Sequence, residues 1–392
     1  MKKILSYKEY CTGCGLCHSV KNIPFVEDEH GFMQPILSDE DVSFCQKVCP
    51  SCDNFNCKDD YSLWGNVIDS YIGWAQDKEI RKSASSGGIL TALSCYLLDE
   101  GLVDGIIQTT VGDNKPYSTK TVISRTADEV KKCVGSRYSS SSPLYNILQI
   151  IKPGERYAFV GKPCDVQTLR LYLECDSNLA TQIIYFFSFF CAGIPSTNAQ
   201  LELLKQLDCV NIEECQRLDY RGNGWPGFAT AYKTDGTKKT LSYNDSWGKI
   251  LGRDVRKMCR FCIDGIGEYA DIVCADAWIN TTGLPDFSEH EGRNAIFLRN
   301  NRGKKVLLGA EEKDYIYIEQ NYEYFKNFDQ VQKYQNERRS GMRAMLLAMK
   351  MMSKNAPKYN NKKLNILEKG APLKLKIKRF FGTLKRILQK KL

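Results

Sequence analysis

The amino-acid sequence predicts a protein of mixed α+β and α/β class, with a cysteine-rich segment at its N-terminus and a helical tail at its C-terminus. Three observations lead to this fold class. Hydrophobic patterns typical of strands and of helices alternate after Cys57, as in layered α/β architectures. Seven of the 17 cysteines of the 392-residue chain lie before residue 60. Residues 371–392 contain eight Lys or Arg residues and no acidic residue.

The first element is the stretch YCTGCGLCHSV at residues 10–20, whose three cysteines are each separated from the next by two residues. Thiolates at this spacing are typical ligands of a 4Fe-4S cluster, which needs a fourth cysteine. In bacterial ferredoxins the run continues with a cysteine at the position of Lys21, and that cysteine ligates the other cluster. A distant cysteine followed by proline ligates the cluster of the other motif in these proteins, and Cys49 is such a residue. The sequence therefore predicts one 4Fe-4S cluster in a ferredoxin-like segment, held by Cys11, Cys14, Cys17 and Cys49.

A second cluster is not expected in this segment, because Asp39 and Val42 occupy positions that would be cysteines in a second ferredoxin motif. Cys45, Cys52 and Cys57 are then spare thiols. A zinc knuckle is the alternative, since C-x2-C is also a zinc spacing. We favour the iron-sulfur interpretation, because a close triplet combined with a distant Cys-Pro pair is a ferredoxin arrangement.

The next element is SASSGGILTALSCYLLDEG at residues 83–101, where apolar residues recur at helical spacing from Ile89 and Gly101 ends the pattern. We expect the serines to cap this helix and residues 103–111 to form a buried strand. Glycines and hydroxyls that open a helix offer backbone N–H groups to a phosphate. The same pattern is more often an ordinary capped turn.

Two further cysteines follow predicted strands, Cys164 after YAFVG and Cys191 after IIYFFSFF. Open α/β sheets build their sites at such strand ends, although a single cysteine there is more often a buried thiol. The pair Cys259 and Cys262 has metal-ligand spacing and needs two more soft ligands. Cys164 and Cys191 are candidates to supply them, and the competing candidates are Cys274, Cys209 and Cys215.

The order of six stretches along residues 70–300 resembles the coenzyme F420 hydrogenase/dehydrogenase beta subunit family. The stretches are RKSASSGGILTAL, GSRYSSSSPL, FVGKPCDVQTLRLYL, FFCAGIPS, DYRGNGWPGF and CRFCIDGIGEYADIVCADAW. Six motifs in sequence are more specific than any one of them, and a ferredoxin-like segment in front is frequent in that family. The resemblance implies an iron-sulfur flavoprotein with a mixed α/β flavin-binding domain that holds FAD.

The resemblance also implies site residues. The flavin phosphate would contact Ser85, Ser86, Gly87 and Gly88. A flavin or substrate loop would contain Ser136, Arg137 and Tyr138. A second 4Fe-4S cluster would be held by Cys164, Cys191, Cys259 and Cys262. At three positions the chain differs from the residue that is usual in the family: Arg137 stands in place of Lys, Asp165 in place of Gln, and Ala275 in place of Gly. These differences leave the identity of the substrate undetermined.

Four regions are expected from these patterns: a ferredoxin-type domain at 1–60, two α/β regions at 61–153 and 154–330, and a helical tail at 331–392. Apolar residues within 337–355 favour a helix in the tail, and residues 354–363 favour a polar linker.

The function that the resemblance implies is that of an oxidoreductase. Electrons would pass from a ferredoxin or another low-potential donor through the 4Fe-4S clusters to FAD, and on to an unknown substrate such as a glycan or a lipid-linked intermediate. The alternative is a non-catalytic electron-transfer subunit of a larger redox complex. A flavin suits either role because clusters carry single electrons and a hydride carries two. The deazaflavin coenzyme F420 is compatible with the family but not required, and no catalytic acid or base is identified.

The net charge of +9 at pH 7 lies mostly in the tail, and no nucleic-acid-binding motif accompanies it, so a nucleic-acid partner is not expected. The tail predicts a basic amphipathic helix that starts near Pro372, and such a helix suits an anionic membrane surface. Its predicted apolar face consists of Ile377, Phe380, Phe381, Leu384, Ile387 and Leu388. No leader segment is recognisable, and no apolar run reaches the roughly 20 residues that span a bilayer. We expect a cytoplasmic protein that contacts the inner membrane face through residues 371–392.

Overall fold

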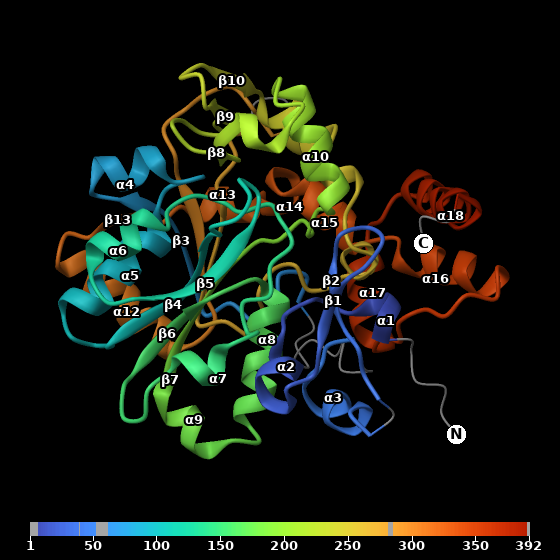
Figure 1. The fold of residues 1–392 in the computed structure, drawn as a ribbon, viewed down its shortest axis with the longest axis horizontal. Coiled ribbons are helices and arrows are strands. Elements are labelled where there is room, and N and C mark those ends of the chain that lie inside the picture. Colours follow the sequence, from blue (N-terminus) through green and yellow to red (C-terminus); the bar gives the residue numbers. More distant parts are fainter. Residues whose placement is uncertain (1–6, 39, 52–61, 281–284, 390–392) are drawn as a thin grey trace.

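A mixed eight-stranded sheet lies at the centre of the computed structural model, which describes residues 7–38, 40–51, 62–280 and 285–389 (Figure 1). The strand order is β13 (Ile316–Glu319), β3 (Asp69–Ala75), β12 (Asn294–Leu298), β11 (Ile272–Asp276), β7 (Ile183–Phe189), β6 (Tyr157–Val160), β4 (Gly105–Val111) and β5 (Thr119–Ser124). Strands β11, β7, β6 and β4 are parallel to one another. The outer strands pair antiparallel. The predicted mixed α/β class is therefore confirmed, and both regions predicted at 61–153 and 154–330 contribute strands to this one sheet.

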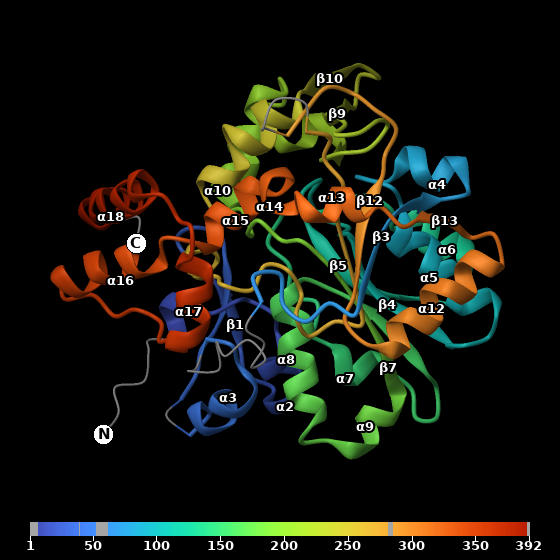
Figure 2. The same cartoon turned by 180° about the vertical axis from the view of Figure 1, so that it is seen from behind.

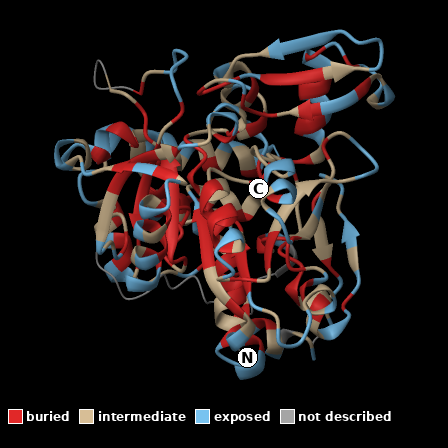
Figure 3. Cartoon of the chain, turned by 90° about the vertical axis from the view of Figure 1, so that its left-hand side faces the viewer, coloured by how far each residue is buried: buried red, intermediate tan, exposed pale blue. Residues whose placement is uncertain are grey.

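Helices follow most of these strands: α4 (Lys78–Ser83), α5 (Ile89–Asp99), α6 (Ala127–Lys132), α7 (Ile147–Ile150), α8 (Pro163–Leu173), α9 (Ser177–Gln182) and α12 (Asn301–Glu312). Neighbouring residues of a strand point to opposite faces of the sheet. Ile106 accordingly packs on one face with residues of α5 and α12. Ile107 packs on the other face with residues of α7 and α8. Figure 3 shows that the strands are largely buried between these two layers.

The N-terminal segment packs on the face that α7 and α8 cover. It consists of α1 (Tyr7–Tyr10), α2 (Leu16–Lys21), the paired strands β1 (Phe25–Glu27) and β2 (Met33–Pro35), and α3 (Val42–Val48). Cys14, Leu16 and Val48 belong to the same hydrophobic cluster as Val166 and Leu169 of α8. The cysteine-rich segment is thus part of the main body of the molecule.

A smaller lobe lies above the large sheet in Figure 1. Its three-stranded antiparallel sheet has the order β10 (Lys238–Leu241), β9 (Ala229–Lys233) and β8 (Cys215–Asp219). The helical pieces around it are α10 (Thr197–Gln206), η1 (Ile212–Glu214), η2 (Asn244–Gly248) and η3 (Leu251–Arg253). The chain then returns to the main body through α11 (Lys257–Arg260), the short helix that carries Cys259.

Helices dominate the C-terminal region, as predicted: α13 (Tyr322–Lys326), α14 (Phe328–Val331), α15 (Lys333–Arg339), α16 (Met342–Met351), α17 (Asn361–Glu368) and α18 (Leu373–Leu388). Figure 2 shows α16, α17 and α18 beside the N-terminal segment, at the opposite side of the molecule from α5 and α12. A single hydrophobic cluster joins Tyr10 of α1, Phe261, Met345 of α16, Leu364 of α17 and Ile387 of α18. None of the helices within the described ranges is both long and apolar enough to cross a bilayer.

The structure corrects two local expectations. The serines before α5 do not cap it, because Gly88 occupies the N-cap position in the left-handed conformation (φ 78°), and Asn294 accepts a hydrogen bond from the N–H of Ile89 at 3.3 Å. The predicted apolar face of α18 is also divided. Ile387 is buried in the hydrophobic cluster with α16, whereas Ile377 and Phe381 are exposed.

Candidate functional site

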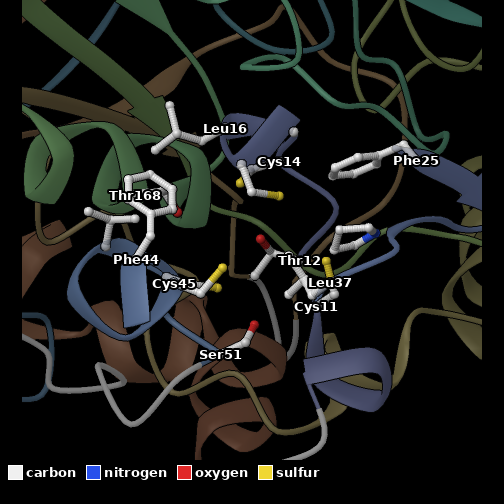
Figure 4. Close-up of a pocket in the computed structure, with 15 residues that line it drawn as sticks. Cys11, Thr12, Cys14, Leu16, Phe25, Leu37, Phe44, Cys45, Ser51 and Thr168 are labelled. Carbon is white, nitrogen blue, oxygen red and sulfur yellow. The ribbon is translucent and has the colours of Figure 1, made fainter. Parts of the chain in front are cut away.

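Five cysteine side chains line one small cavity between the N-terminal segment and α8. They are Cys11, Cys14, Cys17, Cys45 and Cys49. Figure 4 shows Cys11, Cys14 and Cys45 around this cavity, with the side chain of Thr168 of α8 also on its wall. Apolar side chains fill most of the remaining wall, among them Leu16, Phe25 and Phe44. Thiols in an apolar shell are a donor set that fits an iron-sulfur cluster.

Burial controls the electrostatics of this cavity. Burial, with a smaller contribution from the neighbouring Cys49, raises the pKa of Cys11 to about 11 and the pKa of Cys14 to about 12. The Arg256 guanidinium acts in the opposite direction on the pKa of Cys11. The N–H of Gly13 donates a 3.2 Å hydrogen bond to the sulfur of Cys11. Buried thiols of this kind become thiolates when a metal replaces their protons.

Cys45 is a cavity residue that the sequence interpretation treated as spare. It lies on α3, one turn before Cys49, whose N–H donates a 2.8 Å hydrogen bond to the carbonyl oxygen of Cys45. Residues four apart lie on the same face of a helix. The C-x3-C spacing of Cys45 and Cys49 therefore indicates that both thiols face the same cavity. Cys52 and Cys57, the other predicted spare thiols, lie outside the described residues.

The four cysteines proposed for the second cluster come from three separate places and approach one another. Cys164 lies in the first turn of α8, Cys191 follows β7, and Cys259 and Cys262 lie on and just after α11. Cys164 is within electrostatic range of Cys191 and Cys259, and Cys262 is within range of the same two thiols. Burial raises the pKa of Cys191 to about 11. The N–H of Ile194 donates a 3.4 Å hydrogen bond to the sulfur of Cys259.

Two of the three competing cysteines lie away from this group, whereas Cys274 lies near Cys191, since its carbonyl oxygen accepts a 2.9 Å hydrogen bond from the N–H of Phe190. Cys209 and Cys215 belong to the hydrophobic cluster of the smaller lobe and interact with each other there. Cys274 is buried in β11, and burial alone raises its pKa. None of these three is among the thiols that act electrostatically on Cys164, Cys191 or Cys262.

A buried ion pair stands beside the second thiol group. Lys162 Nζ lies 2.7 Å from Asp165 Oδ2, and the two side chains are 11% and 0% exposed. Burial alone would lower the pKa of Lys162, but Asp165 together with the thiols of Cys164 and Cys191 raises it. The Asp165 that departs from the family's usual Gln therefore has a cationic partner of its own.

A larger cavity of about 700 Å³ opens at the carboxyl ends of the parallel strands, between the large sheet and the smaller lobe. Cys191 and Lys162 line it from the sheet side, and Tyr243 and Trp247 line it from the lobe. Of the seven residues assigned to cofactor contacts, six lie on its wall: Ser85, Ser86, Gly88, Ser136, Arg137 and Tyr138. This volume falls within the roughly 300–1,000 Å³ of small-molecule and cofactor sites.

Gly87 is not among the residues that line this cavity. A Cβ atom at this position would lie 2.8 Å from the backbone nitrogen of Asn294 and 2.8 Å from the carbonyl oxygen of Gly73. Gly87 therefore lets the start of α5 pack directly on the sheet. Ser85 and Ser86 are held by backbone partners, since Ser85 Oγ accepts a 2.7 Å hydrogen bond from the N–H of Ser136 and Ser86 Oγ donates one of 2.8 Å to the carbonyl oxygen of Arg293.

Two buried arginines that the sequence interpretation missed hold parts of the site together. Arg221 forms 3.0 Å hydrogen bonds to both carboxylate oxygens of Asp276 at the cavity wall. Arg256 donates to the carbonyl oxygens of Cys11 (3.2 Å) and Met33 (3.0 Å), which ties the N-terminal segment to the loop before α11. No local pattern in the sequence marks either contact, because each joins residues far apart in the chain.

Within the described ranges, no three His, Cys, Asp or Glu side chains form a ready-made shell for a metal ion. The thiols instead stand around a cavity in the first group and converge from three loops in the second. Their soft donor chemistry and apolar surroundings fit iron-sulfur clusters. Two groups of cysteines, one of them beside a cofactor-sized cavity, are features of the oxidoreductase class.

The comparison with known families agrees with this class. The N-terminal part of the coenzyme F420 hydrogenase/dehydrogenase beta subunit matches residues 70–149, and its C-terminal part matches residues 154–323. The chain belongs to this family. The predicted resemblance is thereby confirmed, and oxidoreductase and electron-transfer roles are supported at the level of the family.

Three similar proteins illustrate the family. The chain is 21% identical to one of the subunits of the F(420)H(2) dehydrogenase of Methanosarcina mazei, over 76% of this chain and 82% of that protein. It is 26% identical to the beta subunit of the coenzyme F420 hydrogenase of Methanothermobacter thermautotrophicus, over 60% of this chain and 78% of that protein. In fold it is similar to a chain of the F420-reducing NiFe hydrogenase complex of Methanosarcina barkeri, with a TM-score of 0.58, 21% identity, and coverage of 76% of this chain and 97% of that chain.

These relatives are named as subunits of redox complexes. They favour the alternative interpretation, an electron-transfer subunit, over a self-contained reductase. They lend no support to a glycan or lipid-linked substrate, to a ferredoxin as donor or to FAD in particular.

Proposed function

We propose that this chain is an electron-transfer subunit of an oxidoreductase complex, in which two iron-sulfur clusters connect a partner subunit to a flavin-type cofactor. The observation that carries the proposal is the order of the three sites. Thr168 of α8 lines the first cysteine cavity, Cys164 of the same helix lies beside the second thiol group, and Cys191 of that group lines the large cavity. Electrons can pass through the chain only if the first thiol group, the second thiol group and the cofactor cavity follow one another in space in this way.

The residues of the large cavity suit a flavin nucleotide, and FAD is our proposed occupant. The first turn of α5 presents backbone N–H groups and the positive end of the helix dipole, which favour a phosphate. Tyr138 and Trp247, whose rings are 4.7 Å apart, offer aromatic surface on the opposite wall. When bound, a flavin exchanges two electrons with a hydride carrier and single electrons with an iron-sulfur cluster.

The protein's own groups would position such a cofactor and keep water away from it. Lys162 donates a 2.8 Å hydrogen bond to Ser141 and stands between the second thiol group and the cavity. The buried pair Arg221–Asp276 fixes the wall opposite, where Trp225 donates a further 2.7 Å hydrogen bond to Asp276. Coenzyme F420, which the relatives' names mention, is our proposed hydride partner, and other subunits of a complex are the proposed macromolecular partners.

We also propose that α18 contacts an anionic membrane surface. Leu373, Ile377, Phe381 and Leu388 recur along one side of this helix and are 72%, 49%, 62% and 73% exposed. Lysines flank them, among them the exposed Lys374, Lys378 and Lys385. Apolar residues bordered by lysines suit a lipid surface with negative head groups.

The experiment that tests the main proposal is anaerobic electron uptake by the full chain. The purified protein is mixed with reduced methyl viologen or with reduced coenzyme F420, and the iron-sulfur and flavin absorbances are followed by stopped flow. We expect both absorbances to fall without another subunit present, while sustained turnover requires a partner. Sustained turnover by the chain alone would replace the subunit role by that of a complete reductase, and failure of either cofactor to accept electrons would overturn the proposal.

A further inference from the structure

We propose that the C-terminal helices add an oxyanion-binding subsite to the large cavity, which holds a phosphate or carboxylate group of the molecule that exchanges electrons there. The proposal rests on the proposed function and specifies the chemistry of the acceptor or donor. Its key residues are Arg338 of α15 and Arg379 of α18, both on the cavity wall. Both lie beyond residue 323, where the match to the family ends.

Four guanidinium groups gather near this end of the cavity, and two of them, Arg338 and Arg379, line it. Arg338 lies within electrostatic range of Arg379 and of Arg260, and Arg386 lies within range of the same two. Among the described residues, no carboxylate forms a close ion pair with any of the four, although Asp254 acts on Arg260 and Glu337 acts on Arg379 from a greater distance. Like charges held together in a partly buried place destabilise one another unless anions join them. The thiols of Cys191 and Cys262, which lie within electrostatic range of Arg338, would offset part of this charge as cluster ligands.

The other charged residues on the cavity wall are paired with opposite charges, so the excess of positive charge lies with the arginines. Lys162 is paired with Asp165, and Arg221 is paired with Asp276. The charged residues that remain on the described wall are Arg137, Arg338, Arg379 and Glu337. Glu337 offsets part of the charge of Arg379 but is one carboxylate among three guanidinium groups.

A hydrogen-bond donor without a partner also points to a ligand with oxygen acceptors. The Nε atom of Arg379 is buried and has no hydrogen-bond partner among the described residues. Buried donors without partners are costly, and guanidinium groups bind phosphate and carboxylate oxygens with pairs of hydrogen bonds. An oxyanion beside Arg338 and Arg379 would offset their charge and accept hydrogen bonds from their guanidinium groups.

The position of Arg379 is fixed by the packing of α18. Its Nη2 donates a 2.7 Å hydrogen bond to the carbonyl oxygen of Glu337. Its aliphatic stem lies against Gly341, where a Cβ atom would come within 2.8 Å of Arg379 Cγ. The guanidinium group is therefore held at the cavity by the close approach of the chain at Gly341, a glycine with φ 70°. This packing gives the tail helix a role inside the molecule in addition to its exposed apolar side.

The test measures binding of simple oxyanions to the full chain, purified anaerobically with its cofactors. Isothermal titration calorimetry uses inorganic phosphate, pyrophosphate and malonate at constant ionic strength, so that phosphate and carboxylate chemistry are compared directly. The variants are Arg338→Gln and Arg379→Gln. The matched control is Lys378→Gln, which removes an exposed positive charge from the neighbouring position of α18.

We expect at least one of the three anions to bind the wild-type chain and each arginine variant to weaken it about tenfold or more, since a charged hydrogen bond contributes that much. The control should bind within about twofold of wild type. Absence of binding to the wild-type chain, or equal affinity of both arginine variants and wild type, would overturn the subsite and leave the arginines as counter-charges of the second thiol group. Iron-sulfur and flavin absorbance is recorded for every variant, so that failure of the proposed function is seen separately from failure of the subsite.

Discussion

The hydroxyl group of Thr168 donates a 2.8 Å hydrogen bond to the carbonyl oxygen of Cys164, one turn earlier on α8. Thr168 lines the first cysteine cavity, and Cys164 lies beside Cys191 and Cys259. One turn of an α-helix rises about 5.4 Å. A single helix therefore joins the walls of the two thiol groups, as the proposed electron path requires.

Replacement of Cys164 by Ser should remove the second cluster and leave the first. Because Cys164 belongs to the second thiol group and does not line the first cavity, iron per chain should fall by about half, from roughly eight to roughly four atoms. Iron and acid-labile sulfide analysis measures this. The control is Cys175→Ser, since Cys175 is exposed two residues after the end of α8. A Cys164→Ser protein with unchanged iron would contradict the assignment.

The fourth ligand of the first cluster is tested by comparing Cys49→Ser with Cys45→Ser. Both thiols line the cavity, but the ferredoxin pattern assigns the ligand role to the cysteine before proline. Cys49→Ser should lose the iron-sulfur signal of this segment in electron paramagnetic resonance of the reduced protein, and Cys45→Ser should keep it. The opposite result would assign the fourth position to Cys45.

The fold class and several elements follow from the local sequence. Helical spacing from Ile89 predicts α5, and the apolar run before Cys191 predicts β7. Both depend on hydrophobic periodicity, which adjacent residues determine. The cap of α5 was predicted wrongly, because the left-handed backbone of Gly88 and the side chain of Asn294 complete the helix start in place of a serine.

The site could be predicted only where residues of one motif carry it. The thiols were recognised by their spacing, whereas Arg256, Arg338 and Arg379 reach their sites through packing between distant segments. The polar residues 354–363 predict a linker, but helix α17 begins within them, at Asn361. Leu364 and Leu367 of α17 are buried in the cluster with α16 and α18, and such tertiary burial stabilises short helices that local propensity does not.

Loss of the Lys363 charge should destabilise the chain. Lys363 Nζ lies 2.6 Å from Glu268 Oε1, with side chains 5% and 2% exposed, and the pair joins α17 to the loop after Cys262. Lys363→Met leaves the buried carboxylate without this partner and should cost about 3 kcal/mol of unfolding free energy. Denaturant unfolding measures the loss, and the neighbouring exposed Lys362→Met should change it by less than about 0.5 kcal/mol. Adding Glu268→Gln to Lys363→Met should recover part of the loss, and no recovery would show that the pair is not its cause.

Membrane contact of α18 should depend on its exposed apolar residues. The double variant Ile377→Asp, Phe381→Asp places two negative charges on this side of the helix, so its co-sedimentation with vesicles that contain phosphatidylserine should fall several-fold from the wild-type value. Val210→Asp is the control, because Val210 is 76% exposed on the smaller lobe. Equal sedimentation of the wild type and the double variant, or equal binding to uncharged vesicles, would refute this contact.

The central claim is that two iron-sulfur clusters and a flavin share this chain. Anaerobic purification of the full chain, followed by its visible spectrum and by analysis of iron, acid-labile sulfide and extracted flavin, tests it most directly. We predict a brown protein with roughly eight iron and eight sulfide per chain and one flavin, whose spectrum bleaches on reduction. A colourless protein that contains zinc and no flavin would contradict the account.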